Sequence, residues 1–268
     1  MLARIDELIK YRELLRNLVV RDLKVRYKNS VLGVLWSLLN PLLMMTVLTV
    51  VFTVMTPSDI PDFPVFVLCG LLPWNFFASS MTAATGSIVE NASLVKKVYF
   101  PREVLPLSVV LSNMVNFLIA FVALFAMSII FQVRITAWVL LMPLIVLIQV
   151  MFTSGMAFFL STLNVFYRDT KIIVEVGMMA WFFVTPVFYP IHKLPPNYVL
   201  WGINVNVQRW LRIVNPMASL VAAYRDVLFW GRMIGPDFLF RTFVTALVIL
   251  VGGYWVFSRY SRTFGEEV

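Results

Sequence analysis

A short run of basic and aromatic residues is the part of this sequence best suited to chemistry with a partner. Residues 91–108 read NASLVKKVYFPREVLPLS and connect two apolar runs, each long enough to cross a bilayer. The connection is too short to be a domain, yet it holds Lys96, Lys97, Tyr99, Phe100, Pro101, Arg102 and Pro106. Aromatic and arginine side chains are those that anchor protein interfaces. The run therefore indicates a surface that another molecule grips.

Residues for catalysis are scarce. The chain has no G-x-x-x-x-G-K-[ST] pattern, so it lacks the loop that cradles nucleotide phosphates. Cys69 is the only cysteine, which excludes a disulfide within the chain and a cysteine-based metal site. His192 is the only histidine and lies on an outer loop, which excludes a histidine-based metal cluster and a Ser-His-Asp triad within the spans. The carboxylates offer no close pair in a cavity: Asp59 and Asp62 flank prolines, and Glu266 and Glu267 close the sequence. We predict no catalytic site, no metal site and no cofactor bound by this chain.

The composition places the chain in a membrane. Its 268 residues are 60% hydrophobic and only 13% charged, with a mean hydropathy of +0.86. Soluble domains are roughly 45–50% apolar and about 25% charged. The net charge of +8 does not indicate nucleic-acid binding, because the basic residues cluster at the ends of apolar spans.

Apolar windows predict an all-α protein with six membrane spans. A helix needs about 20 predominantly apolar residues to cross the hydrocarbon core. The expected spans are residues 31–55, 63–89, 104–133, 135–165, 172–189 and 238–258. The fifth carries only Glu175, and the sixth carries only Arg241, which can extend its charge to the membrane surface.

Charge in the short loops predicts that both termini are cytoplasmic. The first thirty residues hold eight basic and four acidic side chains, and the connections after the second and fourth spans are also basic. The loop TPSDIPD on the opposite side is acidic. Lysine and arginine favour the cytoplasmic side. The first span is too long for a cleaved signal and follows thirty other residues.

Residues 190–236 do not follow this distribution of charge between the two sides of the membrane. They lie on the outer side by count, yet they contain five basic residues against Asp226 alone, and prolines interrupt their apolar stretches. We expect two short re-entrant helices in the outer leaflet, since non-helical backbone at that depth must be covered by protein or water.

The N-terminal segment, residues 1–30, reads as an amphipathic helix. One ridge is formed by Leu8, Tyr11, Leu15, Val19, Leu23 and Tyr27, while arginines occupy the other faces. Such a helix lies in the cytoplasmic interface of the membrane. Packing on a partner domain just below the membrane is the alternative.

Ion-coupled transport is disfavoured. Carriers of that kind place ionisable groups near the bilayer midplane. Here the most polar midplane residues are Asn113, Asn116 and Gln149. The energy for any transport is therefore expected from outside this chain.

Four motifs in order resemble the membrane subunit of a type-2 ABC exporter, of the branch that exports O-antigen, capsular polysaccharide and teichoic acid. They are YKNSVLGVLWSLLNPLLMM, KKVYFPREVLPLS, LNVFYRDTKIIVEVGMMAWFFVTPVFYP and NPMASLVAAYRDVLFWG. Together they cover nearly the whole chain. The resemblance implies a permease in the bacterial cytoplasmic membrane that pairs as a homodimer with two copies of an ATPase subunit, which binds ATP and Mg²⁺.

The resemblance also assigns roles to residues. It makes residues 91–102 a coupling helix that docks in the ATPase, with Lys96, Lys97, Tyr99, Phe100 and Arg102 as its grip. Aromatic side chains on spans one, two and five are candidates for lining the channel and stacking on sugar rings: Trp36, Trp74, Phe76, Phe77, Trp181 and Phe182. Residues 190–236 become an outer gate, in which Arg209, Arg212 and Arg225 are candidates for the diphosphate of a lipid-linked glycan.

Other functions stay open at this point. An ABC exporter of a drug or a lipid fits the same spans, and a membrane enzyme acting on lipid-linked sugars is a more remote alternative. An adjacent gene for a P-loop ATPase would favour the exporters, and neighbouring glycosyltransferase genes would favour a polysaccharide as cargo.

Overall fold

The computed structural model describes residues 10–55, 60–195, 198–200 and 203–268. In chain order the long elements are α2 (Arg12–Tyr27), α3 (Trp36–Val50), α4 (Phe63–Glu90), α5 (Ala92–Lys97), α6 (Val104–Ile130), α7 (Met142–Phe166), α8 (Thr170–Val184), β1 (Tyr198–Leu200), β2 (Ile203–Val205), α9 (Val207–Val214), α10 (Pro216–Leu228), α11 (Pro236–Tyr260) and α12 (Phe264–Glu267). Short helical turns at Gly33–Leu35, Val51–Met55, Ala137–Leu141 and Ile191–Lys193 lie between them.

The prediction of an all-α membrane protein is confirmed. Five helical segments in the described ranges are long and apolar enough to cross a membrane: Gly33–Val54, Phe63–Glu90, Val104–Ile130, Ala137–Phe166 and Pro236–Tyr260. The fifth expected span corresponds to α8, whose 15 residues give a length of about 22 Å. Because this is less than the roughly 30 Å of the hydrocarbon core, the count of six spans stays a prediction.

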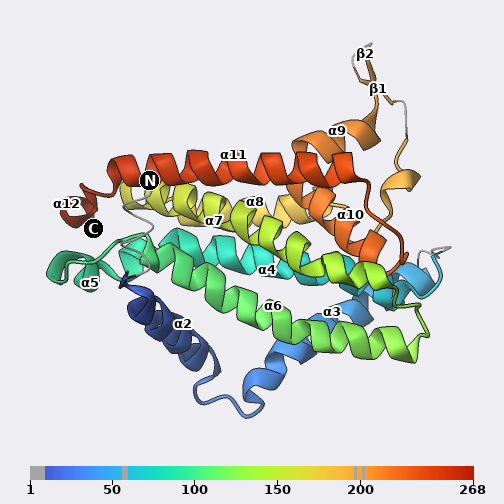
Figure 1. Cartoon of the computed structure of the whole chain (residues 1–268), viewed down its shortest axis with the longest axis horizontal. Helices are drawn as coiled ribbons and strands as arrows, with labels where there is room; N and C mark the ends of the chain where they lie inside the picture. Colours follow the sequence, from blue (N-terminus) through green and yellow to red (C-terminus); the bar gives the residue numbers. More distant parts are fainter. Residues whose placement is uncertain (1–9, 56–59, 196–197, 201–202) are drawn as a thin grey trace.

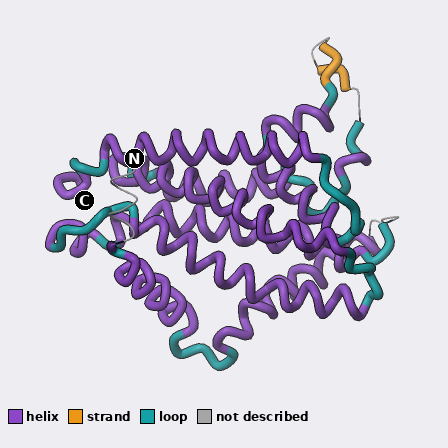
Figure 2. Tube along the Cα trace, in the orientation of Figure 1, coloured by secondary structure: helices purple, strands orange, loops and turns teal. Residues whose placement is uncertain are grey.

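The long helices lie side by side along the molecule (Figure 1). One end of the bundle, which we call the α5 end, carries α5, α12 and the C-terminal residue. The opposite end, the α9 end, carries α9 and the β1–β2 hairpin. Loops gather at these two ends, apart from the turn that joins α2 and α3 in a V on one flank (Figure 2).

Two hydrophobic clusters hold the bundle together. α4 is buried along most of its length and forms the centre of the larger cluster, packed between α6 and α7. A smaller cluster at the α5 end joins Leu18, Phe100, Phe257 and Phe264. In contrast, α8 buries only Thr170 and Val174, so most of its apolar surface faces outward.

The N-terminal helix packs on the bundle rather than standing free. α2 lies against α6, and Leu18 is buried in the smaller cluster. The predicted apolar ridge is partly buried between Tyr11 and Tyr27, and the arginines are exposed. Leu8 lies outside the described residues. That α2 lies in the membrane interface stays a prediction.

The segment 190–236 holds two short helices with defined starts. Asn206 caps α9 by accepting a hydrogen bond from the backbone N–H of Arg209 at 2.9 Å, and Asn215 caps α10 through the N–H of Ala218 at 3.2 Å. Such caps satisfy backbone groups that the first turn leaves free. α10 is largely buried, and none of the residues of α9 is. The β1–β2 hairpin was not predicted, and the depth of the two helices in the membrane is still an expectation.

Candidate functional site

The α5 end separates the five predicted docking residues into two groups. Lys96, Lys97 and Tyr99 are exposed, and Tyr99 as a residue is 88% exposed. Phe100 is only 9% exposed and belongs to the smaller core cluster. The helix itself covers Ala92–Lys97, a shorter stretch than the expected 91–102. Tyr99 and the lysines thus lie on the surface and stay candidates for docking, whereas Phe100 fixes the segment to the bundle.

A groove lies beside Tyr99. It has a volume of about 390 Å³ and brings Arg102 together with Ser261 and Arg262, which lead into α12. Arg102, the fifth docking candidate, is partly exposed. The groove also contains the carboxylate of Glu103, so its two guanidinium groups leave one net positive charge beside an exposed aromatic ring, which suits a partner surface that carries carboxylates.

Polar contacts tie the neighbouring helices together at this end. Arg168 donates a hydrogen bond to the backbone oxygen of Glu267 at 3.3 Å. Lys171 Nζ lies 2.8 Å from Glu90 Oε1, and this hydrogen bond raises the pKa of Lys171 above its usual value. These contacts link the start of α8 to the end of α4 and to α12.

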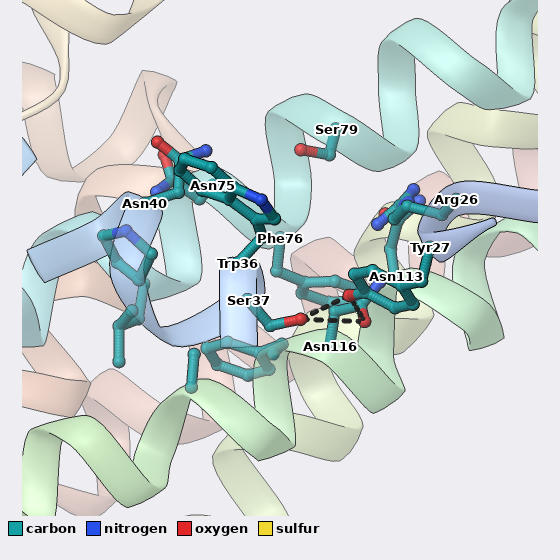
Figure 3. A pocket seen from close by; sticks show the side chains of 14 residues that line it. Arg26, Tyr27, Trp36, Ser37, Asn40, Asn75, Phe76, Ser79, Asn113 and Asn116 are labelled. Carbon is teal, nitrogen blue, oxygen red and sulfur yellow. Dashed lines mark hydrogen bonds between the residues drawn. The ribbon is translucent and has the colours of Figure 1, made fainter. Parts of the chain in front are cut away.

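Halfway along the bundle, on the flank where α2 and α3 meet, lies a polar cavity of about 260 Å³ (Figure 3). The ends of α2 and α3 and the facing sides of α4 and α6 line it with Arg26, Tyr27, Trp36, Ser37, Asn40, Pro41, Leu72, Asn75, Phe76, Ser79, Asn113, Asn116, Phe117 and Ala120. On α4 and α6 the lining residues recur at intervals of three and four, the spacing of one helix face. Amides and hydroxyls converge there within an otherwise apolar bundle.

Hydrogen bonds within the cavity join α2 to α6. Arg26 donates to Asn113 Oδ1 at 2.8 Å, and the Tyr27 hydroxyl donates to Asn116 Oδ1 at 2.6 Å (Figure 3). The Tyr27 and Ser37 hydroxyls are also in contact. Asn116 Nδ2 is buried without a protein partner among the described residues. An unpaired buried amide is costly, so this donor is available to a ligand or water that enters.

The six predicted channel aromatics fall into two places. Trp36 and Phe76 line the polar cavity, and Phe76 stacks on Phe117 with ring centroids 5.1 Å apart. The other four pack on one another where α4 meets α8: Trp74 lies 5.6 Å from Phe182, and Phe77 lies 5.2 Å from Trp181. Trp74 and Phe77 are buried. The structure therefore joins two of the six to the cavity and places the other four in a separate packed cluster.

Arg225 differs from the other two predicted phosphate-binding arginines. It is 5% exposed, and its guanidinium donates to the backbone oxygens of Pro186 at 2.5 Å and Phe66 at 3.3 Å. It also contacts the oxygen of Val187 and lies 3.7 Å from the Phe66 ring centre. Arg225 thus holds the chain after α8 against α4, whereas Arg209 and Arg212 are exposed on α9.

Sequence reasoning missed most of the cavity's polar residues. Asn113 and Asn116 were noted only as polar midplane positions, and Asn40, Asn75 and Ser79 were not singled out. These residues could have been found from the sequence, because polar side chains recur at helical spacing inside the apolar spans. No group of three metal-ligating side chains occurs within the described part of the chain.

The fold and the site define a multi-pass helical membrane protein with a polar cavity on one flank of the bundle and a basic, aromatic surface at one end. The sequence pattern of the ABC-2 type transporter family matches residues 13–229. The chain belongs to this family of membrane transporters.

Relatives extend the comparison over the full length. The chain is 35% identical over 268 residues, all of both chains, to the O-antigen export system permease protein RfbA of Myxococcus xanthus. It is 35% identical over 247 residues, 92% of this chain and 91% of the relative, to the protein of the same name from Klebsiella pneumoniae. A more distant relative, 23% identical over 208 residues, 71% of this chain and 76% of the relative, is the polysialic acid transport protein KpsM of Escherichia coli.

Proposed function

We propose that this chain is the permease subunit of an ATP-driven exporter that moves a lipid-linked polysaccharide across the bacterial cytoplasmic membrane. The polar cavity is the observation that carries the proposal. Its amides and hydroxyls come from four helices and lie next to the rings of Trp36 and Phe76. The names of the full-length relatives, which are O-antigen export permeases, agree with it.

The cavity chemistry fits a sugar. Each asparagine amide offers donors and acceptors, which match hydroxyl groups, and the exposed ring of Trp36 offers a flat face to the apolar side of a pyranose. Arg26 is the only ionisable cation in the lining, so no chain of titrating groups is present there for ion coupling. The arrangement favours an uncharged, hydroxyl-rich cargo over a metal ion or a proton.

The energy would come from an ABC ATPase that holds the ATP and Mg²⁺. Membership of the ABC-2 type transporter family implies such a partner. We assign its docking to the exposed Lys96, Lys97 and Tyr99 together with the groove at Arg102 and Arg262. This places the α5 end, the C-terminal residue and α2 on the cytoplasmic side.

The channel would form between two copies of the chain, served by two ATPases. One bundle does not enclose a wide pore, and α3 and α8 leave long apolar faces uncovered, such as Val176, Met179 and Phe183 on α8. Pairing through these faces would bring Trp181 and Phe182 near the junction of the two copies. Lipid contact on the same faces is the competing arrangement.

Export by a reconstituted permease–ATPase complex tests the proposal. The substitution of Asn75 and Asn116 by leucine removes cavity amides at similar volume, and it should reduce transfer of lipid-linked polysaccharide across the vesicle membrane while ATPase association persists. Ser128→Ala, a buried change elsewhere on α6, is the control. Normal polysaccharide transfer by the leucine variant would refute the role of the cavity. Transfer of a drug or phospholipid instead, by the unaltered complex, would assign another cargo.

A further inference from the structure

Three arginines converge on one concave surface at the α9 end. Arg209 and Arg212 come from α9, and Arg241 comes from the first turns of α11; together with Asn206, Gln208 and Phe238 they line a cavity of about 300 Å³. Arg209 and Arg212 are three residues apart and so share a helix face. Arg241 donates a long hydrogen bond of 3.5 Å to the backbone oxygen of Arg212, which places the Arg241 guanidinium against the C-terminal half of α9.

The local charge is not balanced. A neighbouring cavity of about 410 Å³ shares Arg212 and Phe238 with the first and adds Arg225, Asp226 and Arg232. Asp226 is the only carboxylate that lines either cavity, and it is already paired with Arg232 at 2.6 Å. Within the part of the chain that the structure describes, Arg209, Arg212 and Arg241 take part in no ion pair.

Three guanidinium groups around one hollow repel one another, because arginine keeps its charge in proteins. Such an arrangement is relieved when an anion occupies the hollow. Guanidinium forks match the oxygens of a phosphate with paired, charge-assisted hydrogen bonds. The type and number of the cations therefore point to a phosphate group rather than to a neutral ligand.

The other face of α9 indicates where this phosphate lies. Trp210 and Val214, which are four residues apart, are exposed apolar residues on a different face of the same short helix. A helix with one basic and one apolar face settles at the boundary of lipid headgroups and acyl chains. Phosphate esters are concentrated at that depth.

We propose that Arg209, Arg212 and Arg241 form a binding site for a phosphate ester at the membrane surface. Arg225 does not take part, because its guanidinium is engaged by backbone oxygens. The site accepts either the phosphate of a lipid headgroup or the diphosphate of a prenyl-linked compound, since both present the same oxygens.

Protection of arginine from phenylglyoxal tests the site in the unaltered protein. The chain is placed in nanodiscs of phosphatidylcholine, inorganic pyrophosphate is the probe, and modification is measured by mass spectrometry. Pyrophosphate should protect Arg209, Arg212 and Arg241. Arg134, an exposed arginine at the same end outside both cavities, should react as before. Unchanged modification of the three, or equal protection of Arg134, would overturn the proposal.

Affinity measurements then separate the two sources. Farnesyl diphosphate should bind in phosphatidylcholine discs, and Arg212→Gln with Arg241→Gln should weaken it at least about tenfold, as expected from the loss of charge-assisted hydrogen bonds. Arg134→Gln should leave the affinity unchanged, and equal binding by the double variant would contradict the site. If added phosphatidylglycerol displaces farnesyl diphosphate, the site takes lipid headgroups; if it does not, the site prefers a prenyl diphosphate. Because the readout is anion binding, the result does not depend on whether the chain exports a polysaccharide.

Discussion

Gly155 of α7 and Gly253 of α11 lie in direct backbone contact. A methyl group on Gly253 would come 2.8 Å from the carbonyl carbon of Gly155, and one on Gly155 would come 2.6 Å from the backbone oxygen of Ile249. Small residues let helices approach closely in membranes, where lipid is as apolar as the side chains and packing drives association. This pair therefore sets the distance between two of the membrane-spanning helices.

Gly253→Ala should destabilise the bundle. The added methyl has backbone on the facing side, which cannot rotate away, and overpacking of this kind costs about 1–3 kcal/mol. Thermal unfolding in detergent measures the effect. Gly252→Ala is the matched control, because nothing lies within 4 Å of its added methyl. Equal unfolding temperatures for the two variants would show that the helices do not pack as described.

Tyr99→Ala and Phe100→Ala should have different consequences although the residues are neighbours. Removal of the exposed Tyr99 ring should leave the unfolding temperature unchanged and weaken binding of the ATPase, with a loss on the order of 2 kcal/mol for a central interface residue. Removal of the buried Phe100 ring should lower the stability of the permease itself, by about 3 kcal/mol. Thermal unfolding and co-purification with the ATPase distinguish the two. Undiminished ATPase binding by the Tyr99 variant would remove the docking assignment.

Phe264→Ala should loosen the surface around α5. Phe264 is fully buried and packs on Phe257 at 5.3 Å, in the same cluster as Phe100 and Val95. Loss of a buried phenylalanine costs about 3–5 kcal/mol. Hydrogen exchange should therefore rise at residues 92–105. Trp255→Ala, at an exposed position on α11, is the control and should not raise the exchange. Slow hydrogen exchange at residues 92–105 in both variants would show that Phe264 does not stabilise α5.

Arg225→Gln should destabilise the α9 end of the fold. Glutamine cannot reach all the backbone oxygens that the guanidinium bonds, and the groups left unpaired would cost about 3 kcal/mol in total. Arg232→Gln breaks an exposed pair with Asp226 and a loose contact with the Trp230 ring at 5.9 Å, and it should cost no more than about 1 kcal/mol. Unfolding in detergent compares them. If both variants lose a similarly small free energy of unfolding, the buried hydrogen bonds of Arg225 do not stabilise the fold.

The two ends of the bundle should lie on opposite sides of the membrane. Ser93 of α5 and Arg134 after α6 are exposed at opposite ends, and Cys69 is buried, so single cysteines at the two positions can be labelled selectively. A membrane-impermeant thiol reagent should reach the Arg134→Cys variant from outside, and the Ser93→Cys variant only after permeabilisation. Labelling of both from one side would contradict the orientation.

The sequence alone determined the class of protein and the outline of the fold. Apolar windows define membrane helices because each residue meets the same lipid solvent, so the free energy of insertion is nearly a sum over the local sequence. Pro216 and Pro236 interrupt the apolar stretches of residues 190–236, and both stand at the first position of a helix for an equally local reason, the missing N–H. The motifs also sufficed for the family, since they occur in order along the chain. The span expected at residues 172–189 shows the limit of this reasoning. It is apolar enough to cross a membrane, but the helix found there, α8, has only 15 residues.

Only the tertiary structure decided which residues share a site. Arg26 and Asn113 are 87 positions apart yet hydrogen-bonded, and no local pattern predicts which helices become neighbours. The same holds for Tyr99 and Phe100: both look like interface anchors, but packing of α12 against α5 turns one inward. The sequence made Arg225 a candidate phosphate ligand, but in the structure the backbone after α8 surrounds its guanidinium. The sequence predicted only that Arg241 extends its charge to the membrane surface, whereas the structure places it against Arg212 of α9. Long-range packing, not residue type, assigns each of these side chains its partner.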